Sequence, residues 1–204
     1  MSSTLLQFHA PEIPEDQARA GYYALLARLF YAGPDAKLLE AIAGTESTGD
    51  GQSELAQAWS ALAMAARGTD AKAAGLEYDQ LFVGIGKAEV TPYATFYLSE
   101  TGREKILVRL RGELAGFGLR RADAASEPED HIAALFDAMR HLISLGSDES
   151  ALHNQQDFFN RYIAKSFEPL CNATSASAKA DFYRHVARFA SSFLYVESEA
   201  LKVF

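Results

Sequence analysis

The polar side chains most suggestive of chemistry in this 204-residue chain lie in the run Glu127-Pro-Glu-Asp-His131. Its carboxylates could receive a basic ligand, because a guanidinium group pairs two-pronged with a carboxylate. A structural explanation is also available: Ser126 would cap a helix, Pro128 would sit in its first turn, and the acids would complement the positive helix end. His131 has no purpose in such a cap, so its presence favours a binding or reactive site.

A second group consists of aromatic side chains on both sides of a Gly/Pro-containing loop, residues 84–92. Tyr78 and Phe82 precede the loop, and Tyr93 and Tyr97 follow it. A loop that interrupts a regular helical pattern is often functional. Amphipathic tyrosine rings suit a half-exposed groove for a peptide, although core packing alone would also explain aromatic residues at this density.

The residue patterns of several enzyme classes are absent from the sequence. No Glu-x-x-His pair of a carboxylate-bridged metal site occurs, and the five histidines lack paired ligand spacing. Cys171 is the single cysteine, which excludes an internal disulfide and a thiolate cluster. The run Gly84-Ile-Gly-Lys87 lacks the spacing of a phosphate loop and follows a helix rather than a strand. We therefore predict no catalytic residue, no metal and no cofactor.

Charge and hydropathy limit the classes of partner that can be expected. The net charge is −8, and residues 1–100 carry 6 basic against 13 acidic side chains. An acidic protein repels phosphate backbones, so nucleic acid is not expected to bind, whereas a basic peptide would be attracted. Ordinary solubility would explain the same charge. No apolar run reaches the ~20 residues of a membrane span, and Met1–Gln17 lacks the features of a secretory signal, so we expect a cytoplasmic protein without an integral membrane segment.

Composition and periodicity predict an all-α helical bundle in a single domain, residues 1–204. The chain has 36 Ala and 23 Leu against 6 Val and 7 Ile, a balance that favours helices. Capping boxes are predicted at Thr101–Glu104 and at Ser126–Glu129. The first expected helix begins at Pro14. The others cover residues 52–67, 69–83, 101–117, 126–145, 147–167 and 178–197.

Three motifs in this order resemble the TorD/DmsD family. They are Tyr78-Asp-Gln-Leu-Phe-Val-Gly84, then Pro92-Tyr-Ala-Thr-Phe-Tyr97, then Glu127-Pro-Glu-Asp-His131 at the start of a long helix. Phe182-Tyr-Arg184 is similar to the last helix of that family. The resemblance extends roughly from Gln17 to Val196, and the ordered set is more specific than any single motif.

The resemblance implies a chaperone for redox-enzyme maturation. Such a protein would bind the twin-arginine leader and the apo form of a molybdenum-containing oxidoreductase, aid cofactor insertion and hold back export. Family leader-binding positions fall on Tyr78, Leu81, Phe82, Pro92, Tyr93, Tyr97, Glu127, Asp130 and His131. The basic head of a leader would meet Glu127 and Asp130, and its apolar stretch would lie on the aromatic residues.

Two further questions stay open at this point. The alternative function is a GTP-dependent switch or enzyme that uses the Gly84–Lys87 loop together with Asp130 and His131. The protein is expected to be a monomer or a homodimer, because helix exchange through residues 84–92 or 118–125 would leave no mark on the sequence. The first of these loops is the predicted hinge.

Overall fold

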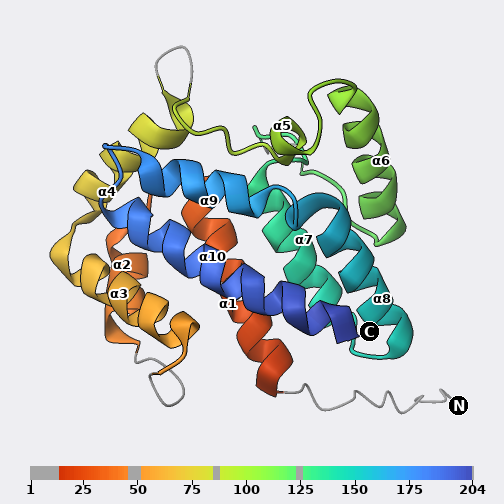
Figure 1. Ribbon diagram of the computed structural model, residues 1–204, viewed down its shortest axis with the longest axis horizontal. Coiled ribbons are helices and arrows are strands. Elements are labelled where there is room, and N and C mark those ends of the chain that lie inside the picture. The colour runs from red at the N-terminus through yellow and green to blue at the C-terminus, as the bar shows by residue number, and fades with distance from the viewer. Residues whose placement is uncertain (1–13, 46–51, 85–87, 123–125, 204) are drawn as a thin grey trace, which may run out of the picture.

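Helices form the regular structure of the described residues, so the predicted all-α fold is confirmed (Figure 1). The computed structural model describes residues 14–45, 52–84, 88–122 and 126–203. The helices are α1 (Pro14–Tyr31), α2 (Ala36–Gly44), α3 (Glu54–Gly68), α4 (Ala71–Tyr78), α5 (Ala94–Leu98), α6 (Arg103–Gly116), α7 (Ile132–Ser144), α8 (Glu149–Phe158), α9 (Phe167–Ala176) and α10 (Phe182–Ala200). Short π-helical turns extend α4 over Asp79–Val83 and α8 over Phe159–Ile163, and a 3₁₀ turn, Leu201–Val203, follows α10.

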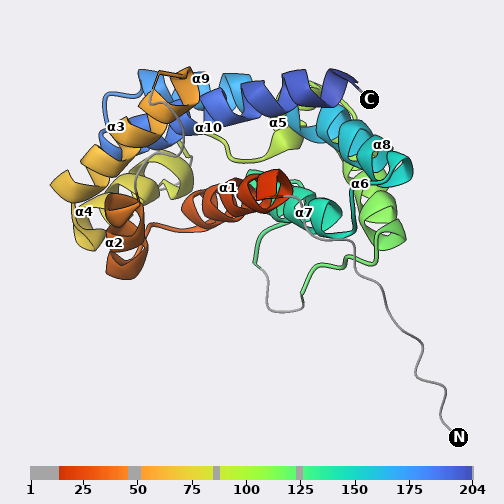
Figure 2. The ribbon, with the colours of Figure 1, turned by 90° about the horizontal axis from the view of Figure 1, so that it is seen from below.

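The helices pack in two layers (Figure 2). α1 and α7 lie side by side beneath α9 and α10, and α3 covers the other flank of α10. The apolar faces of α1, α7 and α10 meet between the layers, where Leu26, Phe136 and Phe189 are almost completely buried. Each such side chain contributes roughly 1.5–3 kcal/mol to folding through its burial. The apolar stripes seen in the sequence therefore hold the layers together.

Local signals set most helix ends. α1 begins at Pro14, as predicted, and ends shortly before Gly33. Asp35, Ser53, Asp70 and Asp148 cap α2, α3, α4 and α8 by accepting backbone N–H groups at 2.8–3.2 Å. Such caps satisfy donors that a helix start leaves without an intrahelical partner.

Long-range contacts fix two other places. A β-carbon added to Gly33 would come within 2.7 Å of Gly75 Cα, so the α1–α2 turn and α4 approach too closely for any side chain there. The Glu77 carboxylate accepts the backbone N–H groups of residues 181–183 at 2.7–3.1 Å. A side chain of α4 therefore caps α10, which joins the start of the last helix to the middle of the chain.

Both predicted capping boxes are wrong. Gly102, with φ 73°, precedes α6, and no side chain caps that helix. α7 begins at Ile132 rather than near Ser126, because residues 92–94 pair with residues 130–132 through an isolated bridge. Tertiary pairing thus overrides the local capping signal, and 126–130 form a turn instead of a first helical turn.

Several helix predictions differ from the structure, and other predictions fall on residues outside the described ranges. The single helix expected over 147–167 is α8 with its π-helical turn, and α9 is a separate helix that follows it. Periodicity missed α2, α5 and α9, which have only 9, 5 and 10 residues. Residues 1–13, on which most of the argument against a secretory signal rests, lie outside the described residues. The same holds for residues 85–87 and 123–125 of the two loops proposed for helix exchange.

Candidate functional site

Two of the sequence motifs meet at the start of α7. Ala94 N donates to the Asp130 carbonyl and Ile132 N donates to the Pro92 carbonyl, both at 2.8 Å. This pairing places Tyr93 beside His131, with ring centroids 5.5 Å apart and the rings nearly perpendicular. Motifs separated by more than thirty residues in sequence therefore form one cluster.

His131 is the N-cap of α7, which corrects the expectation that it has no capping purpose. Its Nδ1 accepts the backbone N–H of Ala133 at 3.2 Å, so the neutral ring carries its proton on Nε2. Burial lowers the pKa of His131, and the negative charges of Glu127 and Asp130 oppose that shift only in part. The ring is therefore held neutral, with Nε2–H as its remaining donor.

The two acids that were predicted to receive a basic head have different environments. Asp130 is 5% exposed and accepts a hydrogen bond from the Thr95 hydroxyl at 2.5 Å, which ties α5 to the start of α7. Glu127 is half-buried and accepts from the Tyr93 hydroxyl at 2.7 Å through Oε2. Burial together with this bond raises the pKa of Tyr93 to about 12. Glu127 is thus the more accessible carboxylate, and Tyr93 orients it.

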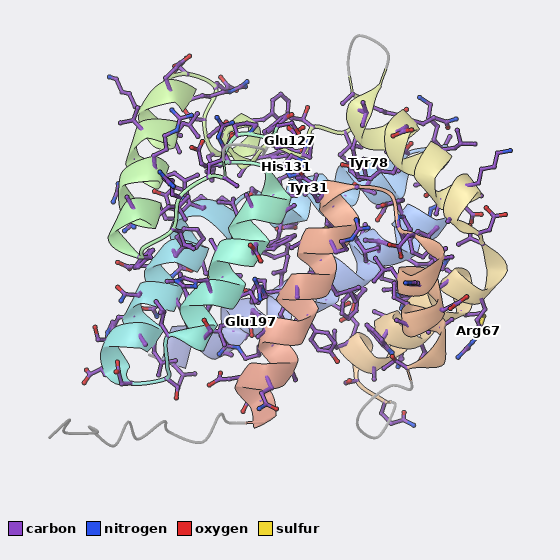
Figure 3. All side chains as sticks on the ribbon, turned by 180° about the vertical axis from the view of Figure 1, so that it is seen from behind. Tyr31, Arg67, Tyr78, Glu127, His131 and Glu197 are labelled. Atoms are coloured by element: carbon purple, nitrogen blue, oxygen red, sulfur yellow. The ribbon has the colours of Figure 1, made fainter. Side chains whose placement is uncertain are left out.

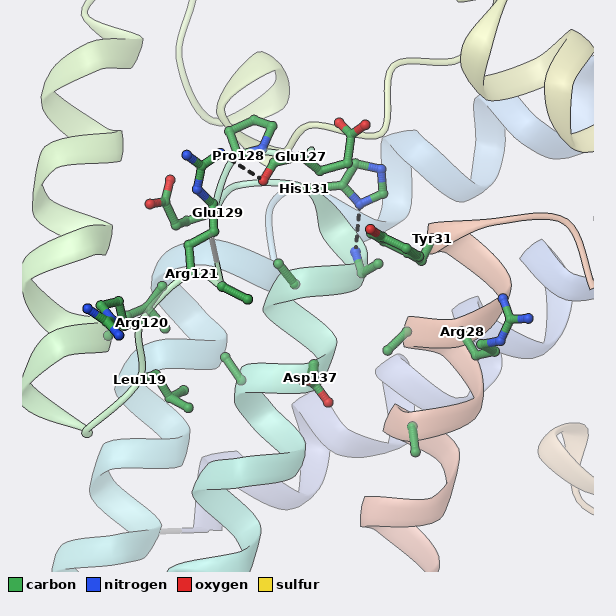
Figure 4. A pocket seen from close by; sticks show the side chains of 17 residues that line it. Arg28, Tyr31, Leu119, Arg120, Arg121, Glu127, Pro128, Glu129, His131 and Asp137 are labelled. Atoms are coloured by element: carbon green, nitrogen blue, oxygen red, sulfur yellow. Dashed lines mark hydrogen bonds between the residues drawn. The ribbon is translucent and has the colours of Figure 1, made fainter. Parts of the chain in front are cut away.

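A pocket of about 540 Å³ lies next to this cluster, between α1, α7 and the segment that joins α6 to α7 (Figure 4). Its size falls within the ~300–1,000 Å³ range of small ligand pockets. The charges on its rim are mixed, with Arg28 on α1, Asp137 on α7 and Glu129 among the lining residues. Arg120 and Arg121 stand on the α6 side, whereas Glu127, His131 and Tyr31 gather at the end next to α1. The pocket therefore offers carboxylates and guanidinium groups around its rim, and Arg121 donates to the Glu127 carbonyl at 3.5 Å.

Tyr31 is a functional candidate that the sequence analysis missed. It is the last residue of α1, it is 48% exposed, and its ring meets the His131 ring edge-on at 6.4 Å. Tyr31 and Tyr93 thus flank the imidazole from two elements. Figure 3 shows Tyr31 beside His131. An exposed aromatic residue at a helix end, just before Gly33-Pro34, was the only sequence signal, and it does not indicate which neighbour the ring contacts.

The aromatic residues before the 84–92 loop lie in the core. Leu81 and Phe82 are 0% and 5% exposed, and Phe82 packs against Phe30 and Tyr183. Tyr78 is also buried, and its hydroxyl donates to the Tyr31 carbonyl at 2.7 Å. Tyr78 therefore fixes the end of α1 that carries Tyr31 (Figure 3).

The nine predicted site residues thus divide into three groups. Glu127 and His131 line the pocket. The start of α7 is surrounded by Pro92, Tyr93 and Asp130. Tyr97 lies on α5, and its hydroxyl donates to the Thr91 carbonyl in the loop before α5 at 2.8 Å. Tyr78, Leu81 and Phe82 support α1 from inside the core.

The described parts of the 84–92 segment are anchored. Val90 is buried and donates to the Leu81 carbonyl at 2.8 Å, and Glu89 forms an ion pair with Lys179 at 2.6 Å. Lys87, on which the nucleotide alternative depends, lies outside the described residues. Gly84 ends this helix with φ 65° and ψ 162°, a conformation outside the left-handed helical region that residues with a side chain rarely adopt.

In 14–45, 52–84, 88–122 and 126–203, no group of three or more His, Cys, Asp or Glu residues could hold a metal ion. Within those same ranges, none of the helices has the length and apolar character needed to cross a bilayer.

Comparison with known proteins identifies the family. Residues 49–172 match the family model described as nitrate reductase delta subunit. The chain is 26% identical over 134 residues to the chaperone protein TorD of Vibrio parahaemolyticus serotype O3:K6 (strain RIMD 2210633), a match that spans 61% of this chain and 62% of that relative. The crystal structure of a candidate redox enzyme maturation protein from Archaeoglobus fulgidus superposes with a TM-score of 0.54, at 20% identity, over 95% of this chain and 98% of that chain. Because the family model covers more than half of the chain, the protein belongs to the nitrate reductase delta subunit family, and the TorD/DmsD membership inferred from its motifs is confirmed.

Proposed function

We propose that this protein is a cytoplasmic maturation chaperone that binds the twin-arginine leader and the apo form of a molybdenum-containing oxidoreductase. It would protect the client and hold back its export until the cofactor is inserted, without catalytic chemistry of its own. Family membership and the similarity to a TorD chaperone support this role. The match covers less than two thirds of that relative, so the client and the leader are proposed for this chain on the basis of its own site.

One observation carries the proposal: the corner of the pocket formed by Glu127, Tyr31 and His131. Glu127 Oε2 accepts a hydrogen bond from the Tyr93 hydroxyl. Glu127 Oε1 accepts only a long contact from the Ser126 hydroxyl, at 3.5 Å, and would be the oxygen that meets a ligand. A leader guanidinium would pair with this carboxylate, and the exposed Tyr31 ring would offer it an aromatic face. His131 is 2% exposed, so donation from its Nε2–H to a peptide carbonyl stays a prediction.

The remaining predicted residues act mainly from behind this corner. Asp130 and Tyr93 hold the start of α7 and the Glu127 carboxylate, and Tyr78 holds the end of α1. Direct contact of Leu81 or Phe82 with a leader stays a prediction, because both side chains are buried and the core would have to open to expose them.

Calorimetry with a synthetic twin-arginine leader peptide tests the proposal. Glu127→Gln removes the charge but keeps the shape, so the loss of a charge-assisted hydrogen bond, about 1.5–3 kcal/mol, predicts roughly a tenfold to hundredfold weaker Kd. Glu40→Gln on α2 is the matched control, because it makes the same charge change at an exposed position outside the pocket.

The possible calorimetric results distinguish an error in the proposed function from an error in the proposed binding site. If the wild-type protein does not distinguish the twin-arginine peptide from a version with both arginines changed to alanine, the proposed function is wrong. If the peptide binds but Glu127→Gln and Glu40→Gln have equal affinities, the leader binds somewhere else.

A further inference from the structure

The floor of the pocket is a trough of alanines between two antiparallel helices. α1 contributes Ala24 and Ala27, and α7 contributes Ala133, Ala134 and Ala138. Residues three or four positions apart share one helix face, so the alanines form two parallel rows. Ala24 and Ala134 are exposed although they lie at the junction of two packed helices. Methyl side chains on both rows leave open a space that larger residues would fill.

The walls of the trough are also largely apolar. Leu114 and Leu119 line it on the α6 side, and Pro128 and Tyr31 close the end where Glu127 stands. From His131 to Ala138 the trough follows seven residues of helix, roughly 10 Å at ~1.5 Å per residue. That length matches about three residues of an extended chain or two turns of a helix.

We propose that this trough receives the apolar stretch of the leader, with bulky aliphatic or aromatic side chains against the alanine floor. The inference rests on the proposed function and adds a second subsite to it. The position of Glu127 sets the direction of the peptide. Glu127 accepts its basic head at one end, and the apolar stretch continues from that corner over the alanines.

This placement differs from the surface expected from the sequence. The aromatic side chains of Tyr78 and Phe82 were expected to cover the apolar stretch, but they are buried in the core. Within the alanine floor, Ala24 and Ala134 are exposed and Ala27 is half-buried, whereas Ala133 and Ala138 are 4% exposed and lie beneath them. Burial of such a surface is favourable in itself and needs no rearrangement of the core.

The test uses the full chain and two peptides, one with the twin-arginine head alone and one with the head followed by its apolar stretch. The wild-type protein is expected to bind the longer peptide about tenfold more tightly, the effect of roughly 1.4 kcal/mol. Ala134→Phe fills the trough at an exposed position and is expected to abolish this gain while leaving the affinity for the head peptide unchanged. Ala73→Phe, at an exposed position of α4 outside the pocket, is the matched control.

Ala24→Leu repeats the test from α1, which keeps the proposal testable if Ala134→Phe lowers the helix content seen by circular dichroism. The trough assignment is overturned if both variants bind the longer peptide as tightly as the wild type, while Glu127→Gln still weakens the head peptide and so upholds the proposed function. If the wild type binds neither peptide, both proposals fail. If the variants change only the mass measured by light scattering, the trough accommodates a second copy of the chain and the leader assignment is wrong.

Discussion

Glu197→Gln should destabilise the protein far more than its position near the C-terminus suggests. Glu197, on α10, is 2% exposed and accepts hydrogen bonds from Arg19 Nε at 2.7 Å, Arg19 Nη2 at 3.1 Å and the Tyr23 hydroxyl at 3.1 Å (Figure 3). Arg19 also donates to Gln155 of α8 at 3.0 Å. These polar contacts join both layers of the bundle at a place shielded from solvent.

The magnitude follows from what the substitution leaves behind. The Arg19 side chain is 14% exposed, and with Glu197 neutralised it keeps Asp16, at 2.7 Å, as its remaining ion-pair partner. Removal of one partner from a buried ion pair typically costs about 3–5 kcal/mol. Because Asp16 and Gln155 still accept hydrogen bonds from the Arg19 guanidinium, we expect a loss at the lower end of this range, about 3 kcal/mol. That is a large share of the ~5–15 kcal/mol that stabilises most domains.

Urea unfolding, followed by circular dichroism and by Trp59 fluorescence, measures the change. Glu199→Gln is the control on the same helix: Glu199 pairs with Lys202 at 2.5 Å, but the two side chains are 50% and 66% exposed. An exposed pair contributes about 0–1 kcal/mol, so the control should lose less than about 1 kcal/mol. The reasoning is refuted if Glu197→Gln loses less than about 1 kcal/mol, or if both variants lose the same amount.

Three further predictions concern stability. Glu77→Gln weakens the cap on α10 and should lower the unfolding free energy by about 1–2 kcal/mol in urea; an unchanged midpoint would contradict this. Gly33→Ala would force a β-carbon against Gly75 and should cost about 1–3 kcal/mol, whereas Gly21→Ala, with open space at its β-carbon, should not destabilise; equal melting temperatures would argue against the close approach. Folding lowers the pKa of His131 below its ordinary value of 6.5, so the unfolded chain binds more protons and the unfolding free energy falls as the pH is lowered through this range. His131→Asn keeps a capping side chain and should reduce this loss. Identical pH profiles of the unfolding free energy for the variant and the wild type would exclude the effect.

Much of the fold could be predicted because its signals are local. Pro14 with the acids after it marks the start of α1, and the apolar stripe of α10 has the period of a helix. The same local reasoning failed at Ser126, because backbone pairing of residues 130–132 with residues 92–94 delays the start of the helix until Ile132. A pairing between segments this far apart leaves no trace in the sequence between Ser126 and His131.

The candidate site was predictable only in part, for a related reason. The motifs correctly indicated that Tyr93, Glu127 and His131 belong together. They could not show that Phe82 points into the core, because an aromatic residue on an amphipathic helix looks the same in a groove and in a core. They also missed Tyr31 and the alanines of α1, since methyl groups become a binding surface only when a second helix lies beside them.

The bond from the Tyr78 hydroxyl to the Tyr31 carbonyl has a consequence for how the two regions communicate. It links the π-helical turn that precedes residue 84 to the aromatic wall that an incoming peptide would touch. A ligand that holds Tyr31 in its present position should then also stabilise the end of α4 at Tyr78, because the two are joined by this hydrogen bond. Occupation of the pocket should therefore slow amide hydrogen exchange in a turn that the ligand does not contact.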